Sequence, residues 1–327
     1  MSSAFSGIFA YGVSHMAGLG KGDGLGTHYG PTKAHPTAPK GIMPGLAGWR
    51  WIFIMQGLLT CIIALIAYFT IVDFPEKSAH VAFGPKFLNE DEAAFIVARI
   101  EKDRHDAIPE EFRLGQYLKN ALDLKVWAFA ALFGLSTSCT YSIAFFLPII
   151  LESMGFNVAE SQCLIAPPYV CAALWTYLFA WLGDKYHIRS PFVIANGALC
   201  ILGLALLGFT KSVAVRYFGV FLVTMACNCN VPAVITWQSN CIRGQWKRAL
   251  TSATLVGAGG IGGIIGSTVF RTQDKPHYRP GIYATIGAGA LIIVISLLLV
   301  AKLHRANRRA DNGGKIIEGL AGFRYTL

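Results

Sequence analysis

Three glycines in the segment VGAGGIGGIIGS have the spacing of a phosphate-binding turn. Gly257, Gly259 and Gly262 match G-x-G-x-x-G, in which glycines let the backbone approach a pyrophosphate at the N-terminus of a helix. That chemistry needs a β-strand before the first glycine, an amphipathic helix after the third, and an acid about 20 residues further on. Here the following residues have no polar face, and Asp274 lies in the proline-containing stretch RTQDKP. The sequence therefore argues against a nucleotide site.

The same glycines can instead serve packing between helices. Gly259 with Gly263, and Gly262 with Gly266, form G-x-x-x-G pairs, which let two helix backbones approach closely inside a membrane. We expect these four glycines to form a helix-packing surface that also lets the helix tilt.

Two prolines mark a second group of residues that could do chemistry. A proline inside a helix leaves the carbonyl four residues earlier without its hydrogen bond, which frees Ala144 before Pro148 and Asn228 before Pro232. In hydrocarbon such a carbonyl must line a cavity or find another partner. The polar and aromatic side chains near both prolines are candidates for a substrate pocket: Ser138, Thr140, Tyr141, Asn228, Asn230 and Trp237.

An aromatic ring with two or three hydroxyl or amide donors suits a planar carboxylate. Asn228 and Asn230 are about 200° apart on a helix, so only one of them faces a given cavity. The alternative interpretation is that these side chains make hydrogen bonds between neighbouring helices.

The elements that carry these residues are long apolar segments. Of the 327 residues, 54% are hydrophobic and 14% are charged, whereas soluble proteins have about a quarter charged residues. A bilayer core needs about 20 residues as a helix. The chain is therefore predicted to be an all-α polytopic membrane protein, because eight segments hold no Lys, Arg, Asp or Glu: 1–20, 51–72, 126–151, 161–183, 190–210, 217–242, 249–270 and 280–301.

The net charge of +10 follows the positive-inside rule, and we expect no nucleic-acid partner. The segments after the even-numbered spans, with the tail, hold 19 Lys and Arg residues, against 9 after the odd-numbered spans. We expect the more basic side and both termini to face the cytoplasm, and the protein to lie in the plasma membrane. The eight cysteines lie in the spans without a C-x-x-C motif or a nearby His, so we expect small buried residues and neither a metal site nor disulfides. No cofactor is expected.

Two hydrophilic segments divide the chain. Residues 20–46, rich in Gly and Pro, are expected to form an irregular outer loop. After Asn89, acids precede apolar residues at i, i+3, i+4 and i+7, which predicts an amphipathic helix. We therefore expect four parts: a remnant of an N-terminal transmembrane bundle (1–72), a cytoplasmic linker (73–125), a C-terminal six-helix bundle (126–303) and a basic tail (304–327).

Several stretches resemble the fungal anion:cation symporter branch of the major facilitator superfamily, which includes allantoate, pantothenate and nicotinate permeases. The resemblance covers nearly everything except residues 20–46, and its longest part is most similar to nicotinate transporters. It implies two bundles with alternating access, of which this chain lacks the first four of twelve helices. Gln56 and Cys241 stand where relatives often carry Glu and Asn. The stretches are AGWRWIFIMQG (47–57), FLNEDEAAFIVARIEKDR (87–104), WLGDKYHIRSPF (181–192), NVPAVITWQSNCIRGQWKRALTSATLVGAGGIGG (230–263) and FRTQDKPHYRPGIYA (270–284).

The resemblance also gives roles to residues. The helices of Pro148 and Pro232 correspond to the seventh and tenth, which usually face the central cavity and would bring the candidate pocket residues to the substrate. The charged loop with Asp184, Lys185 and Arg189 either changes its pairing between transporter states or merely orients the protein. For proton coupling, His15 is the only ionisable side chain within the spans. The alternatives are the missing helices or an acid at a span edge: Asp73, Glu152 or Asp184.

Together these observations predict a secondary transporter, proton-coupled by resemblance, for a small organic anion. A nicotinate-like carboxylate is the first expectation, followed by allantoate, pantothenate or a ureido acid. The alternatives are a truncated chain that no longer transports and a nutrient-sensing membrane receptor. We expect that this chain does not transport by itself. An enzyme is not expected, since the spans hold no nucleophile motif and no cluster of His and Asp.

Overall fold

The computed structural model describes residues 48–72, 74–75, 88–104, 113–274, 278–314, 316–320 and 322–327. The described residues up to 104 belong to one compact unit and those from 113 onward to another. The predicted span 1–20, the outer loop 20–46, His15 and Asp73 lie outside the described residues.

Every regular element in the described residues is helical, which confirms the predicted all-α membrane class. Among the described residues, seven helices are long and apolar enough to cross a membrane. They are α2 (Gly48–Thr70), α6 (Leu124–Ser153), α7 (Val158–Tyr186), α8 (Ser190–Phe209), α9 (Val213–Cys241), α10 (Gln245–Val269) and α11 (Arg279–Asp311). The shorter elements are α4 (Glu90–Arg104), α5 (Leu114–Ala121) and two 3₁₀ turns, η1 (Thr272–Asp274) and η2 (Ile317–Gly319).

The described residues of the first unit form one long apolar helix and one charged helix. The segment of α2 has no charged residue after Arg50, and its side chains from Trp51 on are largely exposed, as expected of a surface meant for lipid or other helices. The charged helix α4 opens with three acids, and the backbone N–H of Asn89 donates to Glu92 Oε2 at 3.0 Å. Acids at the first turn complement the helix dipole, which explains where α4 begins.

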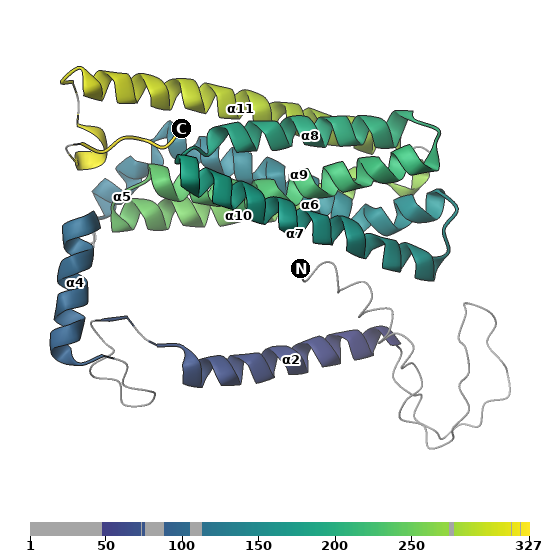
Figure 1. The fold of residues 1–327 in the computed structure, drawn as a ribbon, viewed down its shortest axis with the longest axis horizontal. Coiled ribbons are helices and arrows are strands. Elements are labelled where there is room, and N and C mark those ends of the chain that lie inside the picture. Colours follow the sequence, from purple (N-terminus) through teal and green to yellow (C-terminus); the bar gives the residue numbers. More distant parts are fainter. Residues whose placement is uncertain are drawn as a thin grey trace. The chain divides into compact units, whose positions relative to one another are not determined.

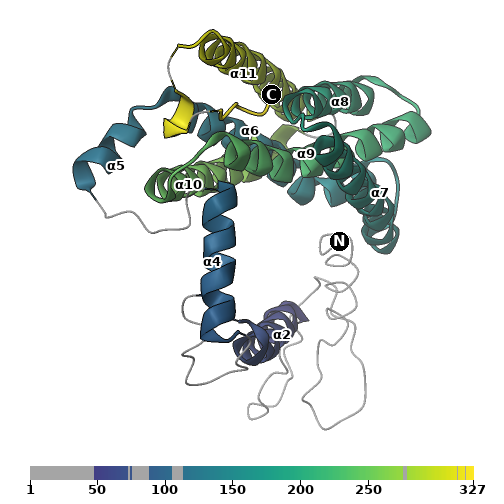
Figure 2. The same ribbon diagram turned by 60° about the vertical axis from the view of Figure 1, so that its left-hand side comes forward.

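The second unit is a bundle of six long helices that run alternately in opposite directions (Figures 1 and 2). The closest pairs are α6 with α10 and α8 with α9, and α11 packs on both α6 and α8. We call the end where α6, α8 and α10 begin the basic end, because it carries Lys125, Arg189 and Lys247. The other end of the bundle is called the opposite end.

Glycine contacts explain why α8 and α9 lie so close together. A Cβ atom at Gly203 would lie 2.9 Å from the backbone oxygen of Gly219, and one at Gly219 would lie 2.8 Å from that of Gly203. Each glycine therefore leaves room for the backbone of the other helix. Sequence analysis did not identify this pair, because the two glycines do not form a local motif.

The core of the bundle is apolar and so is much of its surface. Phe129 and Trp237 are fully buried and meet edge to face, with ring centroids 5.3 Å apart. On the outside, Leu298 of α11 and Ile264 of α10 are both more than 60% exposed. Large apolar side chains that face outward along whole helices fit hydrocarbon and not water.

Candidate functional site

One of the candidate pocket residues, Thr140, lies on a seam between α6 and α9. The Thr140 hydroxyl lies 2.9 Å from the backbone oxygen of Ser136 and 3.1 Å from that of Cys227. The second contact ties α6 to α9 midway along both helices. Thr140 therefore makes the kind of interhelical hydrogen bond that the alternative interpretation assigned to these side chains.

Tyr141 and Asn228 each follow directly after a residue of this seam. Tyr141 is 46% exposed on α6, and Asn228 is half-buried on α9, where its amide donates to the backbone oxygen of Thr224 at 2.8 Å. The exposed surface continues along both helices past Pro148 and Pro232. We call this the proline face; it consists of Tyr141, Ala144, Phe145 and Pro148 on α6 and of Asn228, Pro232 and Ile235 on α9.

Asn230 differs from Asn228 in its surroundings. It is 2% exposed, and its side-chain oxygen has no hydrogen-bond partner among the described residues. The two asparagines thus lie on different sides of α9, as their spacing of about 200° requires. Of the two, Asn228 is the one on the proline face.

The four G-x-x-x-G glycines of α10 lie against α6. A Cβ atom at Gly262 would collide with the backbone oxygen of Gly134, and one at Gly266 would lie 2.5 Å from that of Ser138. Gly259 meets the ring of Phe133, and Gly263 lies beneath the ring of Tyr141. In contrast, Gly257 and Gly260 have open space where a Cβ would go.

Two hydroxyl groups that sequence analysis missed reinforce this contact. Thr137 Oγ1 lies 3.3 Å from the backbone oxygen of Gly259, and Ser142 donates to that of Gly266 at 3.1 Å. Both side chains are buried, and both acceptor oxygens belong to glycines, whose backbone is not shielded by a side chain. The sequence signal that could have indicated this contact is the pair of small polar residues Thr137 and Ser142, five positions apart on α6.

Ser138 lies away from the proline face. It borders a groove of about 760 Å³ between α6, α10 and α11, whose other walls include Ile261, Ile265 and Leu291. These walls are apolar, which suits hydrocarbon better than a charged ligand.

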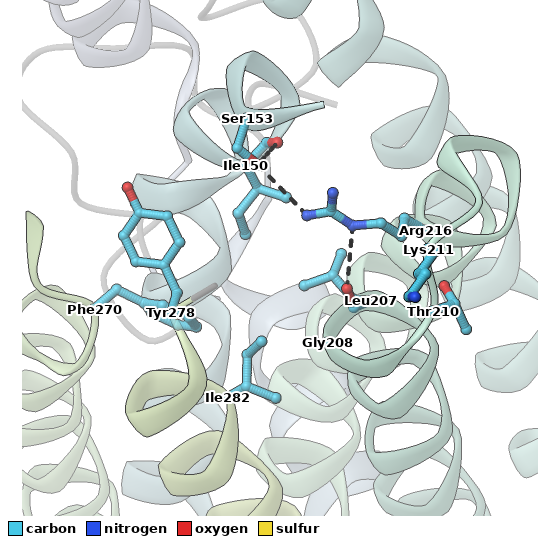
Figure 3. Close-up of a pocket in the computed structure, with 10 residues that line it drawn as sticks. All are labelled: Ile150, Ser153, Leu207, Gly208, Thr210, Lys211, Arg216, Phe270, Tyr278 and Ile282. Atoms are coloured by element: carbon cyan, nitrogen blue, oxygen red, sulfur yellow. Dashed lines mark hydrogen bonds between the residues drawn. The ribbon is translucent and has the colours of Figure 1, made fainter. Parts of the chain in front are cut away.

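A smaller cavity of about 250 Å³ lies at the opposite end, between the ends of α6 and α8 and the starts of α9 and α11. Figure 3 shows the Arg216 guanidinium extended toward Ser153 and Leu207. Its Nε donates to the Leu207 backbone oxygen at 3.3 Å, and Nη2 lies 3.5 Å from Ser153 Oγ. Lys211 also lines the cavity, and its described lining includes no Asp or Glu. The cavity therefore has a positive rim above an apolar floor formed by Ile150, Leu207, Phe270 and Ile282.

Tyr278 closes one side of this cavity. Its backbone adopts a left-handed conformation, with φ of 48°, and it forms the N-cap of α11. Burial, together with the negative charge of Glu152, raises the pKa of the Tyr278 phenol above its ordinary value. The phenol therefore stays neutral and able to donate a hydrogen bond over the physiological pH range.

The loop between α7 and α8 brings two of its three predicted residues together. Arg189 Nη2 forms an ion pair with Asp184 Oδ1, and Gly183 leaves space for the Arg189 guanidinium. Lys185 instead packs over the ring of Trp181, 4.9 Å from its centroid. His187, at φ of 52°, makes the tight turn between the two helices.

Buried charges at the basic end form a cluster that sequence analysis did not identify. Lys125 Nζ lies 2.5 Å from Glu318 Oε1 and 2.6 Å from the Tyr325 hydroxyl. Lys247 Nζ contacts the same Glu318 carboxylate at 2.8 Å and Asp123 Oδ2 at 3.0 Å. We call Asp123, Lys125, Lys247, Glu318 and Tyr325 the charge cluster.

The charge cluster changes the acidity of its members. Burial raises the pKa of the Glu318 carboxyl, but the positive charges of Lys125 and Lys247 outweigh it and hold that pKa below its ordinary value. The same opposition, with a backbone hydrogen bond from Lys125, lowers the pKa of Asp123. Burial and the charge of Glu318 raise the pKa of the Tyr325 phenol. Both carboxylates are therefore charged and the phenol neutral at pH 7.

Glu318 reaches its lysines from a strained backbone. Its φ is 50°, in the left-handed region that side chains other than glycine rarely adopt, at a cost of about 1–3 kcal/mol. The surrounding contacts must outweigh this cost, and the side chain of Glu318 makes two ion pairs and accepts a hydrogen bond from the Tyr325 hydroxyl.

Trp237 lies at the basic end and not near Tyr141. Its indole Nε1 donates to the backbone oxygen of Thr326 at 3.0 Å, and the same oxygen lies 3.5 Å from Cys241 Sγ. Asn307 clasps the backbone of Tyr325 with two hydrogen bonds of 2.9 Å. Residues 304–327 thus divide into the last turns of α11 and a segment that folds back onto the bundle.

No three His, Cys, Asp or Glu side chains that could hold a metal ion converge in the described residues. Five of the eight cysteines are buried, and Cys200 and Cys227 place their sulfur atoms 3.6 Å apart. Cys61 and Cys163 are exposed, contrary to the expectation that all eight are buried, because they lie on outward faces of α2 and α7.

Comparison with known proteins places this geometry in context. Residues 36–267 match the family model described as Major Facilitator Superfamily. A high-affinity nicotinic acid transporter of Saccharomyces cerevisiae is 26% identical over 94% of this chain and 51% of its own length. An uncharacterised transporter of Schizosaccharomyces pombe is 27% identical over 95% of this chain and 56% of its own length. A major facilitator-type transporter of Emericella nidulans is 25% identical over 98% of this chain and 59% of its own length. The chain spans about half the length of these relatives.

Proposed function

Because this chain belongs to the major facilitator superfamily, we propose that it acts in secondary transport of a small organic anion across a membrane. A nicotinate-like carboxylate is the first candidate substrate, and allantoate, pantothenate or a ureido acid come next. The observation that carries this choice is the match to a nicotinic acid transporter over 94% of the chain. A proton is the proposed co-substrate.

The proline face is the proposed substrate surface. It differs from the lipid-facing sides of α10 and α11 in offering a phenol at Tyr141 and an amide at Asn228 between apolar residues. A planar aromatic carboxylate can stack on Tyr141 while its oxygens accept hydrogen bonds from the amide. Thr140 holds the two helices in register beside these groups, and Gly263 supports the Tyr141 ring. The other three predicted residues, Ser138, Asn230 and Trp237, lie in the same bundle but not on the proline face.

The cavity at the opposite end supports an anionic substrate. Arg216 and Lys211 give its rim a positive charge, and the described lining residues include no Asp or Glu, although the Glu152 carboxylate lies close enough to Tyr278 to raise the pKa of its phenol. Such a rim raises the local concentration of anions and disfavours cations. We assign the opposite end to the outer side and the basic end to the cytoplasm, which agrees with the positive-inside rule.

The loop with Asp184 and Arg189 is the proposed site of conformational change. Asp184 is 71% exposed while Arg189 is 11% exposed, so the carboxylate can exchange its partner without moving the buried guanidinium. The ion pair would be closed in one state of the transport cycle and open in another. His15 and the acids at the span edges, Asp73, Glu152 and Asp184, remain the proposed candidates within this chain for coupling to protons.

Uptake of radiolabelled nicotinate by fungal cells that lack their own nicotinate permease tests the proposal. Cells that express the chain within a complete two-bundle transporter should show saturable uptake that unlabelled nicotinate competes away and that a proton uncoupler abolishes, whereas we expect no uptake from this chain by itself. Saturable binding to isolated membranes without uptake would support the receptor alternative. Uptake of allantoate or pantothenate, with nicotinate inactive, would move the assignment to those substrates.

A further inference from the structure

The basic end of the bundle presents a surface that is occupied by the chain's own C-terminal segment. This segment, residues 316–327, contacts the start of α6 at Lys125, the end of α9 at Trp237, and the start of α10 at Lys247. It also contacts α11 at Asn307, and the backbone N–H of Arg189 donates to the Leu327 backbone oxygen at 2.7 Å. One short segment therefore connects five helices of the bundle.

Charge decides how the surface recognises the segment. Lys125 and Lys247 come from different helices, and both direct their ammonium groups at the single carboxylate of Glu318. The side chains of Lys125 and Glu318 are each 7% exposed, so neither charge is compensated by water. Tyr325 adds a hydroxyl that donates to Glu318 at 3.0 Å, and its ring lies 4.4 Å below the Lys125 ammonium group. The surface thus selects an acidic residue followed by an aromatic one.

The segment is held as a peptide ligand would be held. Its only regular element in the described residues is the turn η2, and the rest is fixed by contacts to the bundle. Gly313, with φ of 75°, starts the reversal after α11, and Gly319 and Gly322 also have positive φ. The strained φ of Glu318 means that its backbone conformation depends on its docked side chain.

Many of the contacts that hold the segment are polar and can be replaced by water. Apart from the apolar packing of Ile317, Phe323, Tyr325 and Leu327, its attachment rests on ion pairs and hydrogen bonds. A buried ion pair adds little net binding free energy, because desolvation offsets most of the attraction. Removing one partner is nevertheless costly, since it leaves the other charge buried and unpaired.

We propose that residues 316–327 form a releasable latch, which binds in cis to the basic end and covers Trp237 and Cys241. Release uncovers these two residues and frees the backbone N–H of Arg189 at the start of α8. The latch thereby connects the state of the C-terminal segment to the loop that carries Asp184. The partner that the surface fits is an acidic and aromatic peptide, here supplied by the chain itself.

Alkylation of Cys241 measures the latch directly, because its thiol is fully buried beneath Thr326. The protein in membranes is treated with a small maleimide, and the peptide that contains Cys241 is quantified by mass spectrometry. In Glu318→Gln, and in a variant that ends after Gly314, labelling should be about tenfold faster or more, because Lys125 and Lys247 both lose the Glu318 carboxylate and keep only Asp123 as an acidic partner. Asp311→Asn is the matched control, since it removes the exposed ion pair with Arg324 and leaves the charge cluster intact.

A synthetic peptide of residues 316–327 completes the test. Added to the variant that ends after Gly314, it should restore protection of Cys241, and the same peptide with Glu318→Gln should not at equal concentration. Variants are compared only after gel filtration shows a single folded species, and rescue by the peptide itself demonstrates a folded surface. The latch is refuted if Cys241 labels equally in the wild type and in both variants, or if the two peptides protect equally well. This readout does not involve transport, so it is independent of the proposed substrate.

Discussion

The indole Nε1 of Trp237 donates a hydrogen bond to the backbone oxygen of Thr326, 89 residues further along the chain. The ring is fully buried and packs edge to face on Phe129. An aromatic residue that was a candidate for substrate contact thus connects the bundle core to its C-terminal segment.

Replacing this tryptophan separates the two roles. Trp237→Phe keeps an aromatic ring against Phe129 but removes the N–H donor, so we expect a loss of about 1 kcal/mol of unfolding free energy. The melting temperature of the purified protein should fall, while the half-saturation constant for substrate stays unchanged. Trp181→Phe is the control, because Trp181 is half exposed at the loop. A raised half-saturation constant with an unchanged melting temperature would assign Trp237 to the substrate instead.

Alanine substitutions on α10 distinguish packing glycines from unconstrained ones. Gly262→Ala forces a methyl group against the backbone oxygen of Gly134, which cannot move without α6, so we expect a loss of about 1–3 kcal/mol. Gly260→Ala meets open space and should leave the melting temperature unchanged or raise it, since alanine favours helix. Thermal unfolding in detergent measures both. Equal melting temperatures for the two variants would contradict the packing role of Gly262.

The proline face makes a prediction about affinity. In a complete two-bundle transporter that contains this chain, Tyr141→Ala and Asn228→Ala should each raise the half-saturation constant for uptake about tenfold, which corresponds to ~1.4 kcal/mol. Tyr177→Ala, at a tyrosine that is 75% exposed on α7, should have no such effect. Asn230→Ala should affect stability and leave affinity unchanged, because this side chain is buried away from the proline face. Surface expression is measured for every variant, and unchanged uptake in both Tyr141→Ala and Asn228→Ala would move the pocket elsewhere.

The charge cluster predicts a dependence of stability on pH. Glu318 and Asp123 have pKa values below their ordinary values of 4.5 and 3.8, so their contribution is complete at neutral pH. It is lost as the pH falls through the lowered values, because protonation removes the charges that pair with the lysines. The difference in melting temperature between wild type and Glu318→Gln should be constant above about pH 5 and shrink below it. A difference that grows on acidification would mean that the ion pairs do not stabilise the fold.

The helices could be predicted from sequence because each is a local property of the chain. The charge-free segment 126–151 lies within α6, and 217–242 nearly coincides with the later part of α9. The spacing of the α10 glycines likewise indicates close packing, but not that Gly134 would be the partner. A helix-packing motif identifies one surface, whereas its partner depends on the fold.

The charge cluster could not be predicted for the opposite reason. Lys125 and Glu318 are 193 residues apart, and nothing near either of them indicates the other. From sequence, Lys125 and Lys247 counted only as part of the basic side that sets orientation. The same limit applies to Arg216, whose partner Leu207 offers a backbone oxygen and therefore no recognisable side chain.

The length of α11 sets the height at which its last turns stand above the membrane. Its 33 residues, at 1.5 Å each, extend about 50 Å, whereas the hydrocarbon core is about 30 Å thick. We expect Asn307, which forms two hydrogen bonds with the Tyr325 backbone, to lie on the part of α11 beyond the hydrocarbon core, where Arg305, Arg308 and Arg309 can reach lipid phosphates. The length of α11 therefore sets the distance between the bilayer surface and the two hydrogen bonds that join Asn307 to Tyr325. We expect a thicker bilayer to draw Asn307 into the headgroup layer, so that the lipid composition of the membrane sets how firmly Tyr325 is held.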